Sequence, residues 1–526
     1  MKIEELLKKF EKSKDEHNKF VNLYNEVYKY GMPERYGNIT RTEKGVKATD
    51  EVFTSVFEEA CDGFVQKIQS LLTPVHTDWI NFELGAMFEQ EGIDEQQKQD
   101  AKRTINQIAK MINVFKDNSN FDRAMTQFFY ELIAGTATML VMPGDVNKPL
   151  KFISIPFKEI FMVEGTYGEI DTFFRSLTIK NRLVKQQWKD ATYTYEPTAE
   201  DEERTFIEST YYDYEKNNWV YAVIAEKEKN IIYEKRSDTC PFIEFRWGKI
   251  TGETYGRGQG LKVIADCKTL NQIKYNSLLS LSFAFPVYTV RSEDIDVENF
   301  VMSPGALNPT RENRKDNPPV SALPVNQAPD LAQYNMNQLE MNIKRGMFAS
   351  TIPNDPDRKT TATEIAERVS ELDTAASNAY GASIEFIYRL VQRIADVLSG
   401  FGWVDKTFVK MLDGFNYKVR VNSALTNQQS AKEVQTTLQA LQFMQTLDPT
   451  MQYTQKILNL EKLAPYILEK LGINPEFIRT TEEIQMLEQQ TAEAMAMQQQ
   501  QAMADDVAVA NAKEQGKANA QSQMEG

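Results

Sequence analysis

The sequence predicts an α+β protein, and three observations carry this prediction. Apolar residues recur at helical spacing over residues 1 to 135, and residues 136 to 247 form short runs rich in β-branched and aromatic residues. The chain beyond residue 247 is again mainly helical. Its 526 residues leave room for about three domain-sized masses of roughly 150 residues each, so a sizeable core is available.

The first segment is expected to be helical with one short strand. Its helices each combine charged residues with an apolar side, and the strand alternates apolar and polar residues after a Thr-Pro break. In chain order the expected elements are the helices Glu4–Tyr30 and Asp50–Leu72, the strand Trp79–Leu84, and the helices Asp94–Phe115 and Phe121–Ile133.

The middle segment is expected to form β-sheet, interrupted by a short helix near Asn181–Lys189. Tyrosines cluster here, and they are expected to pack on half-buried sheet faces. A platform that stacks nucleic-acid bases is the alternative, but no basic residues interleave with the tyrosines. The expected strands are Thr138–Met142, Lys151–Ile155, Thr172–Ile179, Phe206–Tyr214, Trp219–Glu226, Ile231–Glu234 and a segment that ends at Trp247.

Two helices then bracket a proline-rich insert. Apolar spacing predicts a helix over Lys262–Phe285 and another over Asp330–Phe348. Between them, six prolines fall between Pro304 and Pro329, which excludes helix and favours short strands and rigid turns.

A polar, proline-broken loop at Ser350–Thr360 precedes the longest expected helix. Thr361 and Glu364 fit a capping box, and apolar residues continue at helical spacing from Ile365 to Val397. A strand at Tyr417–Val421 follows. The remaining chain is expected to be helical, with Gln428–Leu447 as its first helix, and order is expected to end near Asp505 in a Gln- and Ala-rich tail.

Composition narrows the possible functions. The formal net charge of −15 argues against a dedicated basic surface that binds nucleic acid by neutralising phosphates. Cys61, Cys240 and Cys267 are widely spaced, so reduced, buried thiols are expected rather than a disulfide framework or a zinc site. The two histidines, His17 and His76, are expected at the surface rather than in a catalytic site.

No catalytic constellation, metal site or cofactor is assigned from the sequence. The charged, amphipathic N-terminus does not read as a signal peptide. The longest largely apolar run, Leu278–Val290, is shorter than the roughly 18 to 20 residues that a membrane span requires. No membrane embedding is therefore expected.

The stretch from Phe245 to Val290 is the most distinctive in the chain. A strand that ends at Trp247 leads into a glycine-rich turn, Tyr255-Gly256-Arg257-Gly258, and then into a helix that carries the pair Leu270-Asn271. A nucleotide site is one interpretation, since helix N-termini bind phosphates, but the dinucleotide and P-loop patterns are not matched. We expect instead that the glycines permit a tight strand-to-helix reversal with positive φ.

This stretch resembles the head-to-tail connecting (portal) proteins of T7-like short-tailed bacteriophages, in which a tryptophan strand, a Y-G-R-G turn and a helix with an L-N pair follow one another. The resemblance implies a portal-type subunit with a helical and β-rich wing, a two-helix stem, a clip insert, a long wing helix and a helical C-terminal crown. The implied segments are a wing at 1–260, stem helices at 261–285 and 330–348, a clip at 286–329, a channel (tunnel) loop at 349–361, the long wing helix with its strand at 362–425, a crown at 426–485, and a partly disordered tail at 486–526.

The resemblance also implies a function without catalysis. Such subunits form a ring, here expected to have twelve members, at one capsid vertex of the virion, assembled in the host cytoplasm. Double-stranded DNA passes through the ring, driven by a separate terminase motor, and tail adaptor, capsid and scaffold proteins bind around it. The residues implied in the channel loop are Asn354, Asp355, Asp357, Arg358, Lys359 and Thr360, and those implied in clip or tail docking are Arg311, Arg314 and Lys315.

Two other functions remain open at this point. A carboxylate-dependent nucleic-acid enzyme could hold Mg²⁺ with acidic residues such as Asp355 and Asp357. An internal virion core protein is the other, although such a protein should be more uniformly helical than this β-containing chain.

Overall fold

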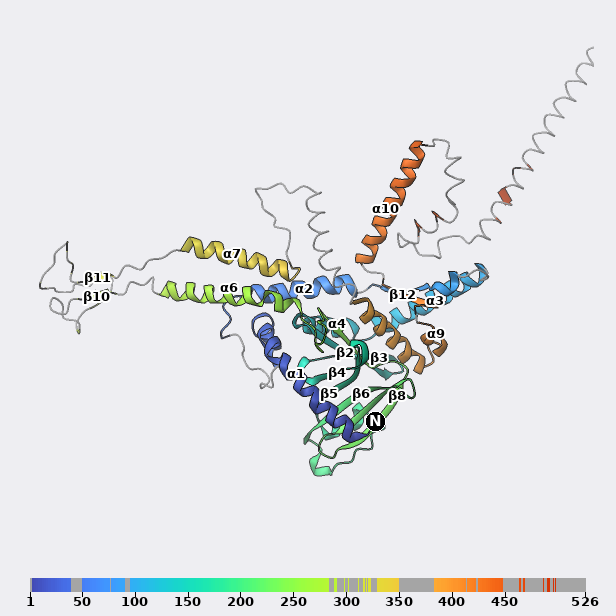
Figure 1. Cartoon of the computed structure of the whole chain (residues 1–526), viewed down its shortest axis with the longest axis horizontal. Helices are drawn as coiled ribbons and strands as arrows, with labels where there is room; N and C mark the ends of the chain where they lie inside the picture. The colour runs from blue at the N-terminus through green and yellow to red at the C-terminus, as the bar shows by residue number, and fades with distance from the viewer. Residues whose placement is uncertain are drawn as a thin grey trace, which may run out of the picture. The chain divides into compact units, whose positions relative to one another are not determined.

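A computed structural model describes most of the chain up to residue 447 (Figure 1). Two compact units, Met1–Ser423 and Ala424–Gly526, are distinguished and are treated separately below. The described residues are 2–38, 50–75, 77–89, 95–282, 288–290, 320–322, 329–349, 383–412, 414–421 and 424–447, with isolated residues between 298 and 318 and between 463 and 497.

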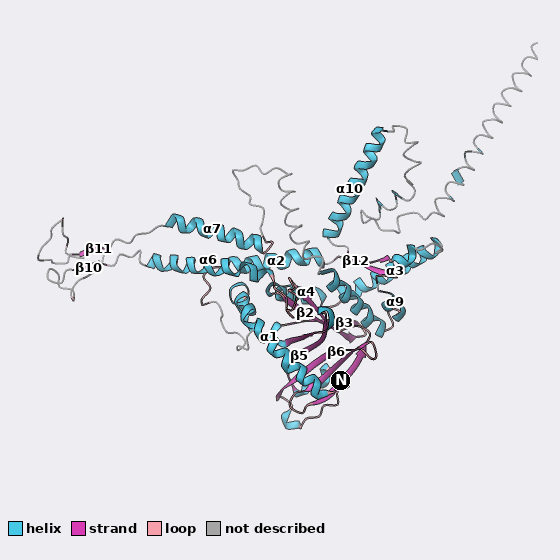
Figure 2. Ribbon diagram, viewed as in Figure 1, coloured by secondary structure: helices cyan, strands magenta, loops and turns pink. Residues whose placement is uncertain are grey.

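The first unit mixes helices and antiparallel sheets, which confirms the predicted α+β class (Figure 2). The predicted N-terminal helices are all present. Their bounds are α1 (Ile3–Gly31), α2 (Val56–Leu72), α3 (Glu95–Asp117) and α4 (Phe121–Ala134), and the predicted strand is β1 (Ile80–Leu84).

Helix α2 begins at Val56 rather than at the expected Asp50, and a side chain distant in sequence explains the difference. The amide nitrogen of Asn271 donates to Glu51 O at 2.9 Å, and its amide oxygen accepts from Phe53 N at 2.7 Å. Because Asn271 already pairs with the Glu51 carbonyl and the Phe53 amide, an earlier start of the helix would add no hydrogen bond at these two groups.

The β-rich middle forms two antiparallel sheets. A five-stranded sheet has the order β4-β5-β6-β7-β8, and a three-stranded sheet has the order β3-β2-β9. Strand β4 and the short α5 (Asn181–Gln187) complete this region; β4 was not predicted. The strands are β2 (Thr136–Asp145), β3 (Lys148–Ile155), β4 (Ile160–Glu164), β5 (Ile170–Lys180), β6 (Glu203–Asp213), β7 (Asn218–Ala225), β8 (Asn230–Ser237) and β9 (Phe242–Arg246).

The remaining described elements follow the glycine turn. Helices α6 (Gln259–Ser282) and α7 (Pro329–Gly346) run side by side, and β10 (Tyr288–Val290) pairs with β11 (Val320–Ala322) between them in the chain (Figure 1). A helix covers residues 383–400, followed by α9 (Lys406–Met411) and β12 (Tyr417–Val421), which pairs with β1. In the second unit, α10 (Ala424–Leu447) confirms the predicted helix.

Several predictions concern residues outside this described set: the 350–360 loop, the capping box, the long helix before residue 383, and most of the chain after residue 447. Among the helices that are described, none combines the length and the apolar character needed to cross a bilayer.

One large core joins the N-terminal helices, the three-stranded sheet, the bases of α6 and α7, and the helix at 383–400. A smaller cluster lies where α1 covers the five-stranded sheet; there Phe10 meets Phe161 with ring centroids 5.3 Å apart. The tyrosines of the sheet mostly pack as predicted, since Tyr193, Tyr211 and Tyr221 are buried. The three cysteines carry free thiols, and Cys61 and Cys267 are buried.

The expectation that His17 lies at the surface is wrong, and His76 is outside the described residues. His17 is only 4% exposed. Its Nε2–H donates to Phe157 O at 2.9 Å, and its ring stacks on Phe157 with centroids 4.3 Å apart. Burial is the main cause that lowers the pKa of His17 from 6.5 to about 4, so the folded protein holds a neutral imidazole near neutral pH.

This burial predicts a specific acid sensitivity. Between pH 6.5 and 4 the unfolded chain binds a proton at His17 and the folded chain does not, so stability is lost as pH falls through this window. Between pH 7 and 5, His17→Gln should lose about 2 kcal/mol less unfolding free energy than the unmodified protein. Urea denaturation at the two pH values measures the difference, and equal pH dependence of the two proteins would contradict it.

Candidate functional site

The glycine turn is a point where three backbone segments contact one another directly. Trp247 N donates to Gly135 O at 2.8 Å, Arg257 N donates to Trp247 O at 2.7 Å, and Gly258 N donates to Ala134 O at 3.0 Å. The end of α4, the end of the β9 segment and the start of α6 are thereby joined by main-chain hydrogen bonds.

Side chains from α1 and the sheets complete the turn. Gly256 N donates to Thr136 Oγ1 at 2.8 Å, and the Tyr24 hydroxyl donates to Gly256 O. Tyr255 is fully buried, and its hydroxyl accepts from Met162 N at 3.2 Å. Burial raises the pKa of both tyrosines, so their hydroxyls stay protonated and act as fixed hydrogen-bonding groups.

The glycines serve close backbone approach, and positive φ between Trp247 and α6 is found at Gly248, with φ of 54°, and at Gly252, with φ of 87°. Gly256, Gly258 and Gly260 are not among the positive-φ residues, so the prediction is wrong for them. A Cβ on Gly258 would lie 2.0 Å from Ile133 O, and a Cβ on Gly256 would lie 2.4 Å from Trp247 O. Only glycine fits where carbonyl groups approach so closely.

This arrangement argues against a phosphate site at the turn. The amides of Gly256, Arg257 and Gly258 all donate to protein oxygen atoms. A phosphate-binding loop instead directs such amides toward its ligand. The Arg257 guanidinium is also engaged, with its Nε 2.9 Å from Glu253 Oε2. The nucleotide interpretation therefore has no support in the geometry.

The turn fixes the base of the α6–α7 helix pair in the core. Val263, Leu270 and Ile343 are buried, and Gly346 lets α7 approach the Val263 side chain. The Leu270-Asn271 pair thus has two separate roles, since Leu270 packs in the core while Asn271 holds the segment before α2.

Farther from the base, the helix pair leaves apolar side chains uncovered. On α6, Leu278 is 53% exposed, and Tyr275 and Leu279 are also exposed. The exposed described residues of α7 over 333–338 are polar, namely Gln333, Asn335, Asn337 and Gln338. One ion pair links the two helices in this region, between Lys274 Nζ and Glu340 Oε1 at 3.6 Å. The pair therefore has a buried base and a distal part in which α6 exposes apolar side chains.

Two arginines fasten the helix at 383–400 to the three-stranded sheet. Arg389 Nη1 donates to both carboxylate oxygens of Glu244, at 2.9 and 3.0 Å, and Arg393 Nε donates to Val141 O at 3.2 Å. Burial alone would lower the pKa of Arg389, but the Glu244 carboxylate reverses this effect and raises it. The helix that follows the predicted channel loop is thus anchored by charge-assisted hydrogen bonds.

The other predicted site residues are only partly placed. Arg311 is described and exposed, whereas Arg314 and Lys315 lie outside the described residues. The same holds for the whole predicted channel loop, from Asn354 to Thr360, including the two aspartates of the alternative Mg²⁺ site. Among the described residues, no group of three or more His, Cys, Asp or Glu side chains is arranged to hold a metal ion.

Sequence reasoning missed the residues that lock the turn from a distance. Tyr24, Gly135 and Thr136 contact Gly256 although they are separated from it by 120 residues or more. A local signal existed only for Gly135, which follows the end of a predicted helix, a position that glycine favours.

Substitution at the turn should test its dependence on close backbone approach. Gly258→Ala forces a Cβ against Ile133 O and C, at 2.0 and 2.6 Å, and backbone atoms have little room to move. We expect a loss of about 3 kcal/mol in unfolding free energy. Gly400→Ala is the matched control, because no heavy atom lies within 4 Å of its added Cβ. Thermal denaturation compares the two, and equal midpoints would contradict the role of Gly258.

Solved structures of gene transfer agent particles contain chains that are similar to this one. A chain in the neck of an empty gene transfer agent (GTA) particle is similar over 73% of this chain and 86% of its own, with 9% identity and a TM-score of 0.33. A chain in the virion of a native GTA particle is similar over 74% and 88%, with 10% identity and a TM-score of 0.30. Both TM-scores are low, and they add no argument here. A comparison with curated proteins finds no match.

The family comparison covers most of the chain. The family model described as bacteriophage head to tail connecting protein matches residues 3–478, which include the helical start, both sheets, the glycine turn and the α6–α7 pair. This match confirms the resemblance proposed from the Trp247, Tyr255–Gly258 and Leu270-Asn271 motif. The chain belongs to the family of bacteriophage head-to-tail connecting proteins.

Proposed function

We propose that the chain is a portal subunit, and that twelve copies form a ring at one vertex of the phage capsid. The family match supports a connector in the virion. The ring is supported by the exposed apolar side chains on the distal part of α6, because exposed apolar surface of this kind marks a protein contact. In a ring, the same side chains would be covered by the helices of neighbouring subunits.

In this proposal the segments take the parts implied by the portal resemblance. Residues 1–260 form the wing, α6 and α7 form the stem, and residues 286–329 form the clip. The helix at 383–400 belongs to a long wing helix over 362–425, and α10 begins the C-terminal crown. The rigid glycine turn would then set the angle at which the stem leaves the wing.

Double-stranded DNA would pass through the ring during packaging and ejection. Arg358 and Lys359, in the channel loop at 349–361, would contact its phosphates, while the net charge of −15 per subunit would keep the bore from retaining DNA. Arg311 and its neighbours in the clip would bind tail adaptor proteins. A terminase motor would supply ATP hydrolysis, and the subunit itself would not be an enzyme.

The α6–α7 pair favours this function over the two alternatives. A nucleic-acid enzyme or an internal core protein gives no reason for a helix pair that is anchored at one end and exposes apolar side chains of α6 at the other. A monomer or small oligomer that cleaves DNA with Mg²⁺, and loses the activity on Asp355→Ala, would favour the enzyme.

The solution mass tests the ring. Purified protein should give a species near twelve times 60.4 kDa by light scattering, and electron images of the same fraction should show a central hole. A species that remains monomeric when co-expressed with its capsid and scaffold proteins would contradict the proposal.

A charge placed on the distal part of α6 should prevent ring closure. Leu278→Asp would bury a carboxylate between subunits, so we expect the fraction of ring at fixed concentration to fall at least tenfold. Gln272→Asp introduces the same charge on the same helix at an exposed polar position, and should have little effect. If both variants form rings like the unmodified protein, the distal face is not an interface.

A further inference from the structure

The hairpin between β4 and β5 presents a tyrosine wholly to solvent. Tyr167 has a relative exposure of 102%, the highest among the exposed large hydrophobic side chains of the described residues. It also has a positive φ of 62°, with ψ of 14°, a conformation that a bulky residue seldom adopts. Strained positions of this kind persist only when the surroundings impose them, and they concentrate at functional sites.

The surroundings of Tyr167 hold the hairpin tip firmly. Gly165 N donates to Glu169 O at 2.8 Å, which closes the turn. Arg246 Nη2 donates to Gly168 O at 3.0 Å, and the same carbonyl accepts from Lys249 Nζ. An aromatic side chain on a rigid support loses little conformational entropy when it binds, so Tyr167 is well suited to act as an anchor.

Further aromatic residues lie beside this tip, on the neighbouring β6–β7 hairpin. Tyr214 is 60% exposed, and its hydroxyl donates to Asp171 Oδ2, at 3.4 Å, directly after the β4–β5 turn. The Tyr212 ring lies 5.0 Å from that of Tyr214 and 5.3 Å from that of Trp219. Aromatic groups gathered in this way are typical of protein interfaces, and Tyr214 is the exception to the predicted packing of the sheet tyrosines.

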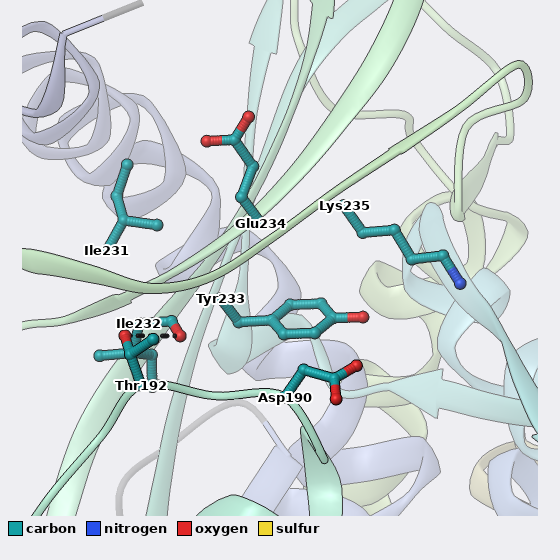
Figure 3. Close-up of a pocket in the computed structure, with 7 residues that line it drawn as sticks. All are labelled: Asp190, Thr192, Ile231, Ile232, Tyr233, Glu234 and Lys235. Atoms are coloured by element: carbon teal, nitrogen blue, oxygen red, sulfur yellow. Dashed lines mark hydrogen bonds between the residues drawn. The ribbon is translucent and has the colours of Figure 1, made fainter.

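A hollow lies on the opposite edge of the same sheet. It has a volume of about 470 Å³ and is formed by β8 and the segment that precedes β6 (Figure 3). The Tyr233 ring supplies apolar wall, and the Asp190 carboxylate lies near this ring, whereas Ile231 lies on the other side of the strand and packs toward α1. Burial, followed by the effect of Asp190, raises the pKa of Tyr233, in agreement with this proximity.

The positions of these two features suit one kind of contact. The sheet order is β4-β5-β6-β7-β8, so the Tyr167 hairpin joins strands at one edge and the hollow follows the other. A closed ring is built from head-to-tail contacts, which require two different, complementary patches on each subunit. A contact with a two-fold axis would instead place the same patch on both sides.

We propose that Tyr167 inserts into the β8 hollow of the next copy of this chain, with its ring against Tyr233 and its hydroxyl donating to Asp190. This proposal rests on the ring of the proposed function. It adds a contact between the wings of neighbouring subunits, separate from the contact made by the α6–α7 pair. The apolar ring is covered by the hollow, and the hydroxyl keeps a hydrogen-bond partner, as a buried tyrosine requires.

Substitution of the anchor tests the contact without disturbing the fold. Tyr167→Asn removes the aromatic ring, and asparagine accepts a positive φ more readily than tyrosine, so the subunit should remain folded. We expect the fraction of ring at fixed concentration to fall at least tenfold. Val146→Asn is the matched control, because Val146 is an exposed apolar residue on the β2–β3 hairpin, with 68% exposure.

Cross-linking then locates the partner surface. The double variant Tyr167→Cys/Thr192→Cys should give a ladder of disulfide-linked subunits on a non-reducing gel after mild oxidation. Each single variant, which retains Cys61, Cys240 and Cys267, should not. This contact is wrong, and the proposed function stands, if three results are found together. The unmodified protein forms rings, Tyr167→Asn behaves like Val146→Asn, and no ladder appears. If the unmodified protein forms no ring in any condition, both proposals fail.

Discussion

Three backbone segments touch without intervening side chains where α4 ends, β9 ends and α6 begins. The contacts require glycine at positions 256 and 258, where any Cβ would lie within 2.4 Å of a carbonyl oxygen. The amides of Gly256, Arg257 and Gly258 also have partners, which Thr136, Trp247 and Ala134 provide. The direction of α6 follows from this arrangement, and with it the position of the whole α6–α7 pair.

The helix pair in turn explains why the subunit suits an assembly. Its base is packed in the core and the distal part of α6 exposes apolar side chains, which neighbouring subunits would cover in the proposed ring. The helix at 383–400 is held separately by Arg389 and Arg393, which bind Glu244 and Val141. The sheet that carries β9 is thus fixed both to the start of α6 and to the helix that follows the predicted channel loop.

Local patterns predicted the helices well, because each buries one face at a constant spacing. Helix α6, for example, begins three residues before the expected Lys262. The pairing of β1 with β12 could not be predicted, since the two strands are more than 300 residues apart and either could pair with other strands. The sequence does contain a signal for the burial of His17, which the prediction did not use. Phe10, His17 and Tyr24 are spaced seven residues apart, so they share the buried side of α1. Within the turn, the motif itself was found, but its partners Tyr24 and Thr136 depend on tertiary contacts.

Hydrogen exchange on α6 tests most directly the claim that neighbouring subunits complete the helix pair. Amides at the base, over residues 263–271, should be protected equally in a monomeric variant and in the assembled protein, because the core covers them in both. Amides over residues 275–282 should exchange at least tenfold more slowly after assembly. Equal exchange of this distal part in both states would contradict the account.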